Sequence, residues 1–187
     1  MFYKFLLDFV DIFTFLNVFK YLTVRTGLAM FTSMAVVLII GTPFIKFFSA
    51  KQITDPIRDD GPSDHIIKKI GTPTMGGLLI LLGLFSSILL WCDLENPYIW
   101  FLIFILFSFG LLCLIDDYKK IKYNNSSGVS LKFKIVFQII FAIIGILILE
   151  YFIQDPGMKN LYFPFFKNLV VNLGWFFIPF SVFIIVG

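Results

Sequence analysis

Long apolar stretches recur along this chain and alternate with shorter polar connections. Four of these stretches, 26–45, 75–92, 96–115 and 169–187, contain no charged residue, and a fifth, 135–154, carries only Glu150. One bilayer crossing needs about 20 predominantly apolar residues, so each stretch is long enough to span. The pattern therefore predicts transmembrane helices at 24–48, 75–92, 96–115, 135–154 and 169–187.

The first 23 residues follow a different pattern. Apolar side chains recur at helical spacing, with charged residues between them at Lys4, Asp8 and Asp11. An amphipathic segment of this kind predicts a helix at 1–23 that lies in the membrane interface or extends the first crossing outward.

The composition supports a membrane location. Hydrophobic residues make up 59% of the 187 residues and charged residues only 14%, whereas soluble domains are about half apolar and a quarter charged. We therefore expect an all-α polytopic integral membrane protein with a single domain over 1–187. The last apolar run ends without a polar or basic stop, so we also expect the chain to be the first part of a longer protein.

The basic residues indicate the orientation, because short cytoplasmic loops collect positive charge. Two connections, 49–74 and 116–134, hold or adjoin ten of the 15 basic residues: Lys46, Lys51, Arg58, Lys68, Lys69, Lys119, Lys120, Lys122, Lys132 and Lys134. Both connections should be cytoplasmic, with the N-terminus outside. The bases could serve topology alone, but beside an acidic pair they favour a phosphate-bearing ligand over nucleic acid.

That acidic pair is Asp116 and Asp117, where the apolar run 96–115 meets a lysine-rich connection. At a helix C-terminus each carboxylate costs about 0.3–1 kcal/mol unless a cation is present. Mg²⁺ is usually held by one or two carboxylates together with substrate phosphates. Neighbouring helical side chains point about 100° apart, so one carboxylate can bind the metal while the other orients water or accepts a proton. The alternative is a solvated helix end balanced by Lys119 and Lys120.

A second candidate anion site precedes the crossing at 75–92. The entry reads Gly71-Thr72-Pro73-Thr74-Met75-Gly76-Gly77, with Lys68 and Lys69 close by. Free amides at a helix start can receive an anion, and the glycines allow close backbone approach. The alternative is a capped turn whose small residues serve helix packing. His65 is the single histidine, and its role stays open.

Together these motifs resemble the phospho-N-acetylmuramoyl-pentapeptide-transferase (MraY, translocase I) family within the polyprenyl-phosphate sugar-phosphate transferase superfamily. The resemblance rests on three blocks: Ile57-Arg58-Asp59-Asp60-Gly61-Pro62 with His65 and Lys69; Gly71 to Gly77; and Asp116-Asp117-Tyr118-Lys119-Lys120. It covers the whole chain, as the first half of a fold of about ten helices by analogy.

The resemblance implies a magnesium-dependent transfer of phospho-MurNAc-pentapeptide from UDP-MurNAc-pentapeptide to undecaprenyl phosphate. The products are lipid I and UMP, made at the bacterial inner membrane for peptidoglycan, and so for cell shape and division. It implies catalytic roles for Asp116, Asp117, Lys69 and Lys132, metal ligation by Asp116 and Asp117, and substrate binding by Thr74, Lys120 and His65. It also allows a homodimer and implies contact with membrane lipid, and it implies no nucleic-acid partner.

The family pattern continues with an Asn/Asp-rich loop, a third essential aspartate and a histidine-rich loop that this chain lacks, so the chain alone is expected to be inactive. Two other functions stay open. One is transfer of another HexNAc-1-phosphate to a polyprenyl phosphate, and the other is a non-enzymatic membrane subunit or transporter. A transporter should carry ionisable residues near mid-span, whereas the candidate groups here cluster at one boundary.

Overall fold

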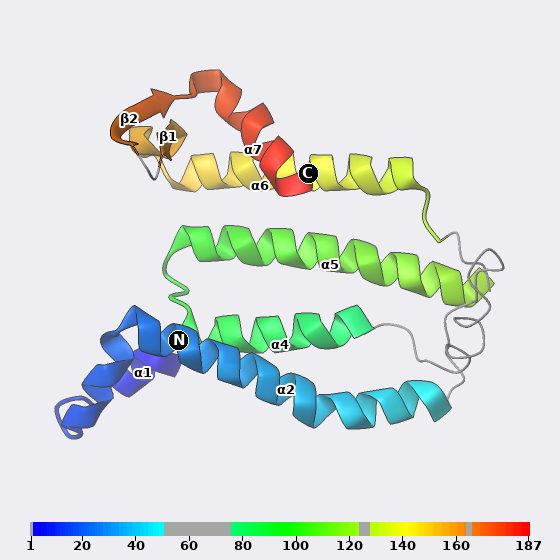
Figure 1. Cartoon of the computed structure of the whole chain (residues 1–187), viewed down its shortest axis with the longest axis horizontal. Coiled ribbons are helices and arrows are strands. Elements are labelled where there is room, and N and C mark those ends of the chain that lie inside the picture. The colour runs from blue at the N-terminus through cyan, green and yellow to red at the C-terminus, as the bar shows by residue number, and fades with distance from the viewer. Residues whose placement is uncertain (1, 51–75, 124–127, 164–165) are drawn as a thin grey trace. The chain divides into compact units, whose positions relative to one another are not determined.

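The computed structural model describes residues 2–50, 76–123, 128–163 and 166–187. They form two compact units, one of Met1–Glu95 with Gly110–Ser130 and the other of Asn96–Phe109 with Leu131–Gly187. Figure 1 shows the elements of both units along the chain. The prediction of a single domain over 1–187 stays a prediction.

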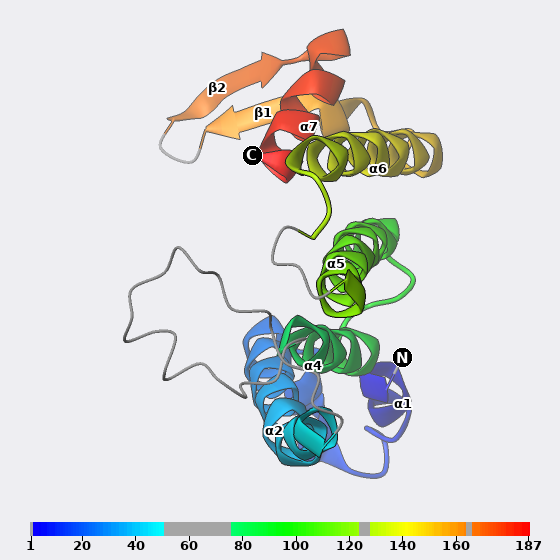
Figure 2. The same ribbon diagram turned by 90° about the vertical axis from the view of Figure 1, so that its right-hand side faces the viewer.

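The first unit is built on two apolar helices, α2 (Leu22–Ala50) and α4 (Gly76–Trp91). They lie side by side (Figure 1, Figure 2). A small residue permits this close approach, because a Cβ on Gly83 would lie 2.9 Å from Val37 Cγ2 and 3.0 Å from the Ser33 carbonyl oxygen. Small residues at such contacts are typical of helices that pack within a bilayer.

The N-terminal segment is not the single helix predicted for 1–23. It consists of α1 (Phe2–Asp8), a turn, and the 3-10 helix η1 (Thr14–Lys20). Asp8 is the last residue of α1. A carboxylate at this position is repelled by the negative end of the helix dipole. Thr14 and Asn17 are also poor helix formers. Apolar periodicity alone therefore extended the predicted helix across a break.

Helix α5 (Pro97–Tyr123) shows that the predicted helix end at 115 was wrong. The helix continues through Asp116 and Asp117 for two further turns. The sequence from Tyr118 to Tyr123 is rich in lysine, which forms helices readily, and Lys120 and Lys122 in the last turn suit the helix dipole. The first charges thus mark a change of polarity within the helix rather than its end.

The second unit contains α6 (Leu131–Phe152), which begins four residues before the predicted 135. A 3-10 helix, η2 (Pro156–Lys159), then leads into an antiparallel hairpin of β1 (Asn160–Phe163) and β2 (Phe166–Asn172). The register pairs Asn160 with Asn172 and Leu161 with Val171. After η3 (Gly174–Phe176), α7 (Phe177–Val186) packs against α6 (Figure 2).

The predicted crossing at 169–187 is therefore wrong in its first part, because residues up to Asn172 form a strand. Two adjacent β-branched residues, Val170 and Val171, favour a strand. Hydrophobicity alone does not distinguish them from other apolar residues. The described residues are also not purely helical, since they include this two-stranded sheet.

The membrane character of the protein is nevertheless clear. Three described helices, α2, α5 and α6, are long and apolar enough to cross a bilayer, and α4 and the segment Gly174–Val186 are shorter apolar helices. Only 6% of the most apolar window of α2 is buried. Continuous apolar surface of this kind is what lipid contact requires and what soluble proteins avoid. The count of five crossings and the orientation stay predictions.

Candidate active site

Asp116 is the buried centre of the candidate site. It lies on α5, two turns before the helix ends, and only 6% of its surface is exposed. One carboxylate oxygen, Oδ1, accepts a hydrogen bond of 2.7 Å from the backbone N–H of Val129. The other oxygen, Oδ2, lies 2.8 Å from Lys120 Nζ. Both oxygens of this carboxylate are thus held by protein groups.

Asp117 is more open and shares the same lysine. Its Oδ1 lies 3.7 Å from Lys120 Nζ, and 28% of its side chain is exposed, against 9% for Asp116. The shared contact requires the helix to continue, because residues three and four apart face one another on a helix. One ammonium between two carboxylates leaves an excess of negative charge within this trio, which suits a divalent cation.

The chemistry of the donors fits Mg²⁺ as a partial ligand set. Carboxylate oxygens are the protein ligands that Mg²⁺ takes, and phosphate oxygens and water commonly complete its shell. Within the described parts of the chain, no group of three or more His, Cys, Asp or Glu side chains could hold a metal ion. The pair could therefore hold Mg²⁺ only with oxygens supplied from elsewhere.

A turn at Gly128 and Val129 lies against Asp116 and Lys120. Gly128 has a φ of +56°, in the left-handed region that favours glycine. A Cβ at this position would run into Asp116 Oδ1 and would lie 2.9 Å from Lys120 Cε. Sequence reasoning missed both residues of the turn. The run Asn124-Asn125-Ser126-Ser127-Gly128 has the composition of a turn and could have drawn attention to it.

The structure brings together three of the predicted site residues, Asp116, Asp117 and Lys120. Lys132 is exposed on the first turn of α6 and belongs to the other unit. Lys69, Thr74 and His65 lie outside the described residues.

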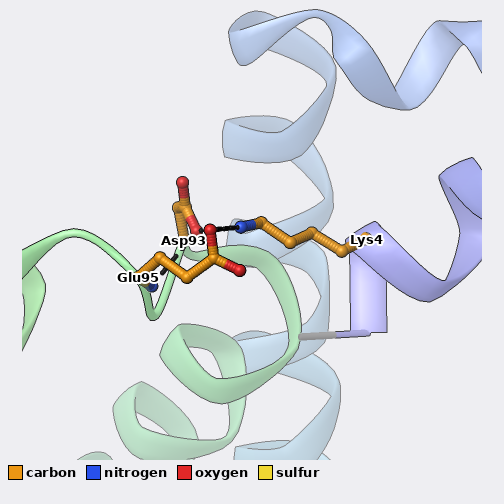
Figure 3. A network of polar contacts seen from close by, with 3 residues as sticks. All are labelled: Lys4, Asp93 and Glu95. Atoms are coloured by element: carbon orange, nitrogen blue, oxygen red, sulfur yellow. Dashed lines mark hydrogen bonds and ion pairs between the residues drawn. The ribbon is translucent and has the colours of Figure 1, made fainter.

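A second polar cluster, beyond the C-terminal end of α4, is structural rather than catalytic in character (Figure 3). Lys4 on α1 lies 3.0 Å from Asp93 Oδ1 and also forms an ion pair with Glu95. Hydrogen bonds to Glu95 and Asp93 hold the pKa of Lys4 above its ordinary value. The pKa of Asp93 is lowered by its bond to Lys4 and then by the backbone N–H of Glu95. These contacts tie α1 to the connection that follows α4.

The sequence is similar to proteins of one named family. Residues 69–81 match the family model described as phospho-N-acetylmuramoyl-pentapeptide-transferase signature 1. The chain is 70% identical over its full 187 residues to the phospho-N-acetylmuramoyl-pentapeptide-transferase of Pelagibacter ubique (strain HTCC1062), of which it covers 52%.

Two other relatives carry the same name. The protein of Caulobacter vibrioides is 45% identical over 178 residues, which are 92% of this chain and 48% of the relative. The protein of Thermodesulfovibrio yellowstonii is 42% identical over 187 residues, which are 100% of this chain and 52% of the relative. The chain thus spans about half the length of these curated relatives. By its signature and its similarity from end to end, it is recognisable as the counterpart of the N-terminal part of a phospho-N-acetylmuramoyl-pentapeptide-transferase.

Proposed function

We propose that the protein containing this chain transfers phospho-MurNAc-pentapeptide from UDP-MurNAc-pentapeptide to undecaprenyl phosphate, giving lipid I and UMP. The main support is a pair of carboxylates that share one lysine at the polar end of a membrane helix, in a chain whose relatives are named for this transfer. In this reaction a phosphate oxygen of the lipid attacks the phosphorus that bears the sugar. The bond to the UMP oxygen breaks, and UMP leaves.

The position of Asp116 suits a lipid acceptor. Asp116 lies 19 residues after Pro97 on α5, or about 29 Å along the helix axis. That distance is close to the ~30 Å thickness of a bilayer's hydrocarbon core. A carboxylate at this depth can meet a lipid phosphate that stays in its leaflet. We therefore propose that the site opens on the cytoplasmic face of the bacterial inner membrane.

The residues of the site have distinct tasks in this proposal. Asp117, the more exposed carboxylate, would hold Mg²⁺ together with Asp116. When bound, Mg²⁺ would screen the charge on the entering lipid phosphate and on the leaving UMP. Lys120 would limit repulsion between the carboxylates and bind phosphate oxygens as the substrates arrive. Lys69 and Lys132 would supply further positive charge, and Thr74 and His65 would contact substrate.

The test is UMP release by the protein expressed from its complete gene. Wild-type protein should release UMP with UDP-MurNAc-pentapeptide and undecaprenyl phosphate, and Asp117→Asn should lower the rate by about 10²- to 10³-fold, as loss of one electrostatic group does. Asp155→Asn is the matched control, because that carboxylate is exposed and accepts a local hydrogen bond from the Gly157 N–H after α6. Faster release with UDP-GlcNAc would indicate a different sugar-phosphate transferase. No release with either donor would favour a non-enzymatic subunit.

A further inference from the structure

We propose that Gly128 is a positioning residue of the active site, because the lack of a side chain there lets the loop backbone lock Asp116 and Lys120 in place. This inference rests on the proposed function for its catalytic readout. It assigns to Gly128 a task that is exerted through its neighbours Asp116 and Lys120.

The first support is the hydrogen bond from Val129 to Asp116. The N–H of Val129 donates to Asp116 Oδ1 over 2.7 Å, across 13 residues of sequence, and both residues are buried. Bonds from a backbone N–H to a carboxylate are among the stronger hydrogen bonds in proteins. A bond that is long-range and shielded from water fixes the orientation of this carboxylate more firmly than a local turn contact would.

The second support is steric. Gly128 takes a φ of +56°, and an added Cβ would collide with Asp116 Oδ1 and lie 2.9 Å from Lys120 Cε. Substitution therefore strains the turn and also displaces the two side chains that it touches. Both side chains belong to the proposed site.

The third support is the connection to Asp117. Lys120 Nζ contacts Asp116 at 2.8 Å and Asp117 at 3.7 Å. A shift of Asp116 or Lys120 therefore changes the charge next to Asp117. Because misplacement of a reacting group by about 1 Å can cost a factor of about 10² in rate, a change at Gly128 should lower kcat more than it raises KM.

The experiment compares two glycines that share a left-handed backbone. Gly174 has a φ of +51°, but the nearest atom to an added Cβ is Asn172 Oδ1 at 3.9 Å. Gly174→Ala therefore imposes backbone strain without the collision. Gly128→Ala adds both the backbone strain and the collision, whereas Gly128→Asn tolerates the left-handed backbone better than alanine but keeps the Cβ. In the full-length protein we expect kcat for UMP release to fall about 100-fold in both Gly128 variants, with donor KM nearly unchanged, and to stay near wild type in Gly174→Ala.

Amide hydrogen exchange provides a readout that does not depend on activity. The Val129 amide should exchange slowly in wild type and in Gly174→Ala, and faster in both Gly128 variants. A Gly128→Ala protein that keeps wild-type kcat would overturn the positioning role, whether or not the Val129 amide becomes faster. Wild-type protein that releases no UMP while the Val129 amide stays protected would overturn the proposed function instead.

Discussion

Lys120 is the residue on which the electrostatic balance of the carboxylate pair depends. It contacts both Asp116 and Asp117, and 25% of its side chain is exposed. Asp116 is buried, so its charge has little access to water. Burial of a carboxylate is unfavourable, and the attraction of a nearby cation offsets this cost. Removing the cation therefore destabilises the folded state.

We therefore predict that Lys120→Met lowers the free energy of unfolding by about 1–3 kcal/mol. Lys122→Met is the control, because Lys122 is exposed and its Nζ lies 5.9 Å from the Tyr123 ring centroid. It should change stability by no more than about 0.5 kcal/mol. Equilibrium unfolding in mixed micelles measures both values, and equal stabilities for the two variants would contradict the partner role of Lys120.

Magnesium should compensate for the missing lysine. A ligand that binds only the folded state stabilises it, by about 2.7 kcal/mol at 100 times its Kd. If the carboxylate pair binds Mg²⁺, millimolar Mg²⁺ should raise the Tm of Lys120→Met more than that of wild type, because the Lys120 ammonium no longer competes for these carboxylates. Asp117→Asn should lose this response. Sodium sulfate at matched ionic strength is the control, and an equal response to both salts would speak against a metal site.

At the scale of single residues, sequence reasoning singled out three side chains that the structure brings together, but not the turn that contacts them. Asp116 and Asp117 were predicted because carboxylates at a helix C-terminus are costly without a cation, and Lys120 because it closes the family motif that the chain resembles. Gly128 and Val129 were not, because their part in the site depends on a backbone N–H and on a φ angle. Neither property is visible in an amino-acid letter, although a glycine after a run of Asn and Ser indicates a turn.

At the scale of elements, hydrophobicity located the helices better than their ends. The uncharged run 96–115 corresponds to the apolar part of α5, yet the helix continues to Tyr123. Hydrophobicity reports the solvent around a segment, whereas a helix end depends on capping and on the next turn. The extension matters for function, because Asp116 meets Lys120 only while the helix persists. The hairpin at 160–172 escaped prediction for a related reason, since a strand and a short membrane span can have the same composition.

The contact between α2 and α4 gives a prediction whose sign depends on the neighbours of a glycine. Alanine is about 1 kcal/mol more favourable than glycine within a helix. At Gly27, no described atom outside its own helical neighbourhood lies within 4 Å of an added Cβ. Gly27→Ala should therefore stabilise the protein. Gly83→Ala should instead destabilise it by about 1–3 kcal/mol, as overpacking does, since its Cβ would press on Val37 and on the backbone of Ser33. Unfolding of the two variants under one condition tests the difference, and stabilisation by Gly83→Ala would show that the helices can move apart freely.

At the scale of the whole molecule, the N-terminal segment should respond to acid. The pKa of Asp93 is lowered, so its bond to Lys4 stabilises the docking of α1 above the unfolded carboxyl value of about 3.9 and is lost as pH falls through the lower folded value. The raised pKa of Lys4 implies loss only at the alkaline extreme, as pH rises through that raised value. The contacts of Lys4 with Asp93 and Glu95 should therefore stabilise the protein fully from about pH 4 to about pH 10.

Trp91 provides the measurement, because it is buried and packs against Phe2 and Phe19. In a variant with Trp100 and Trp175 changed to Phe, Trp91 emission should shift to the red below about pH 4, as the Asp93 carboxylate becomes protonated. Adding Lys4→Gln should abolish this step and leave Trp91 partly solvated at neutral pH. If the red shift is equally large in the Lys4→Gln protein, it arises from carboxylates other than Asp93.

The orientation of the chain decides whether the proposed site can meet its donor, because a nucleotide-linked sugar is available only on the cytoplasmic side. α5 has 27 residues and is about 40 Å long, so it exceeds a ~30 Å hydrocarbon core and extends into water at one end. The basic residues after Asp117 predict that this end is cytoplasmic, since positive loops stay inside.

The orientation can be tested by labelling single cysteines. With the free cysteines Cys92 and Cys113 changed to Ser, Lys119→Cys should react with a membrane-impermeant maleimide only in inside-out vesicles. Glu95→Cys, before the other end of the same helix, should react only in right-side-out cells. The reverse pattern would put the carboxylate pair on the side without nucleotide and would rule out the proposed transfer.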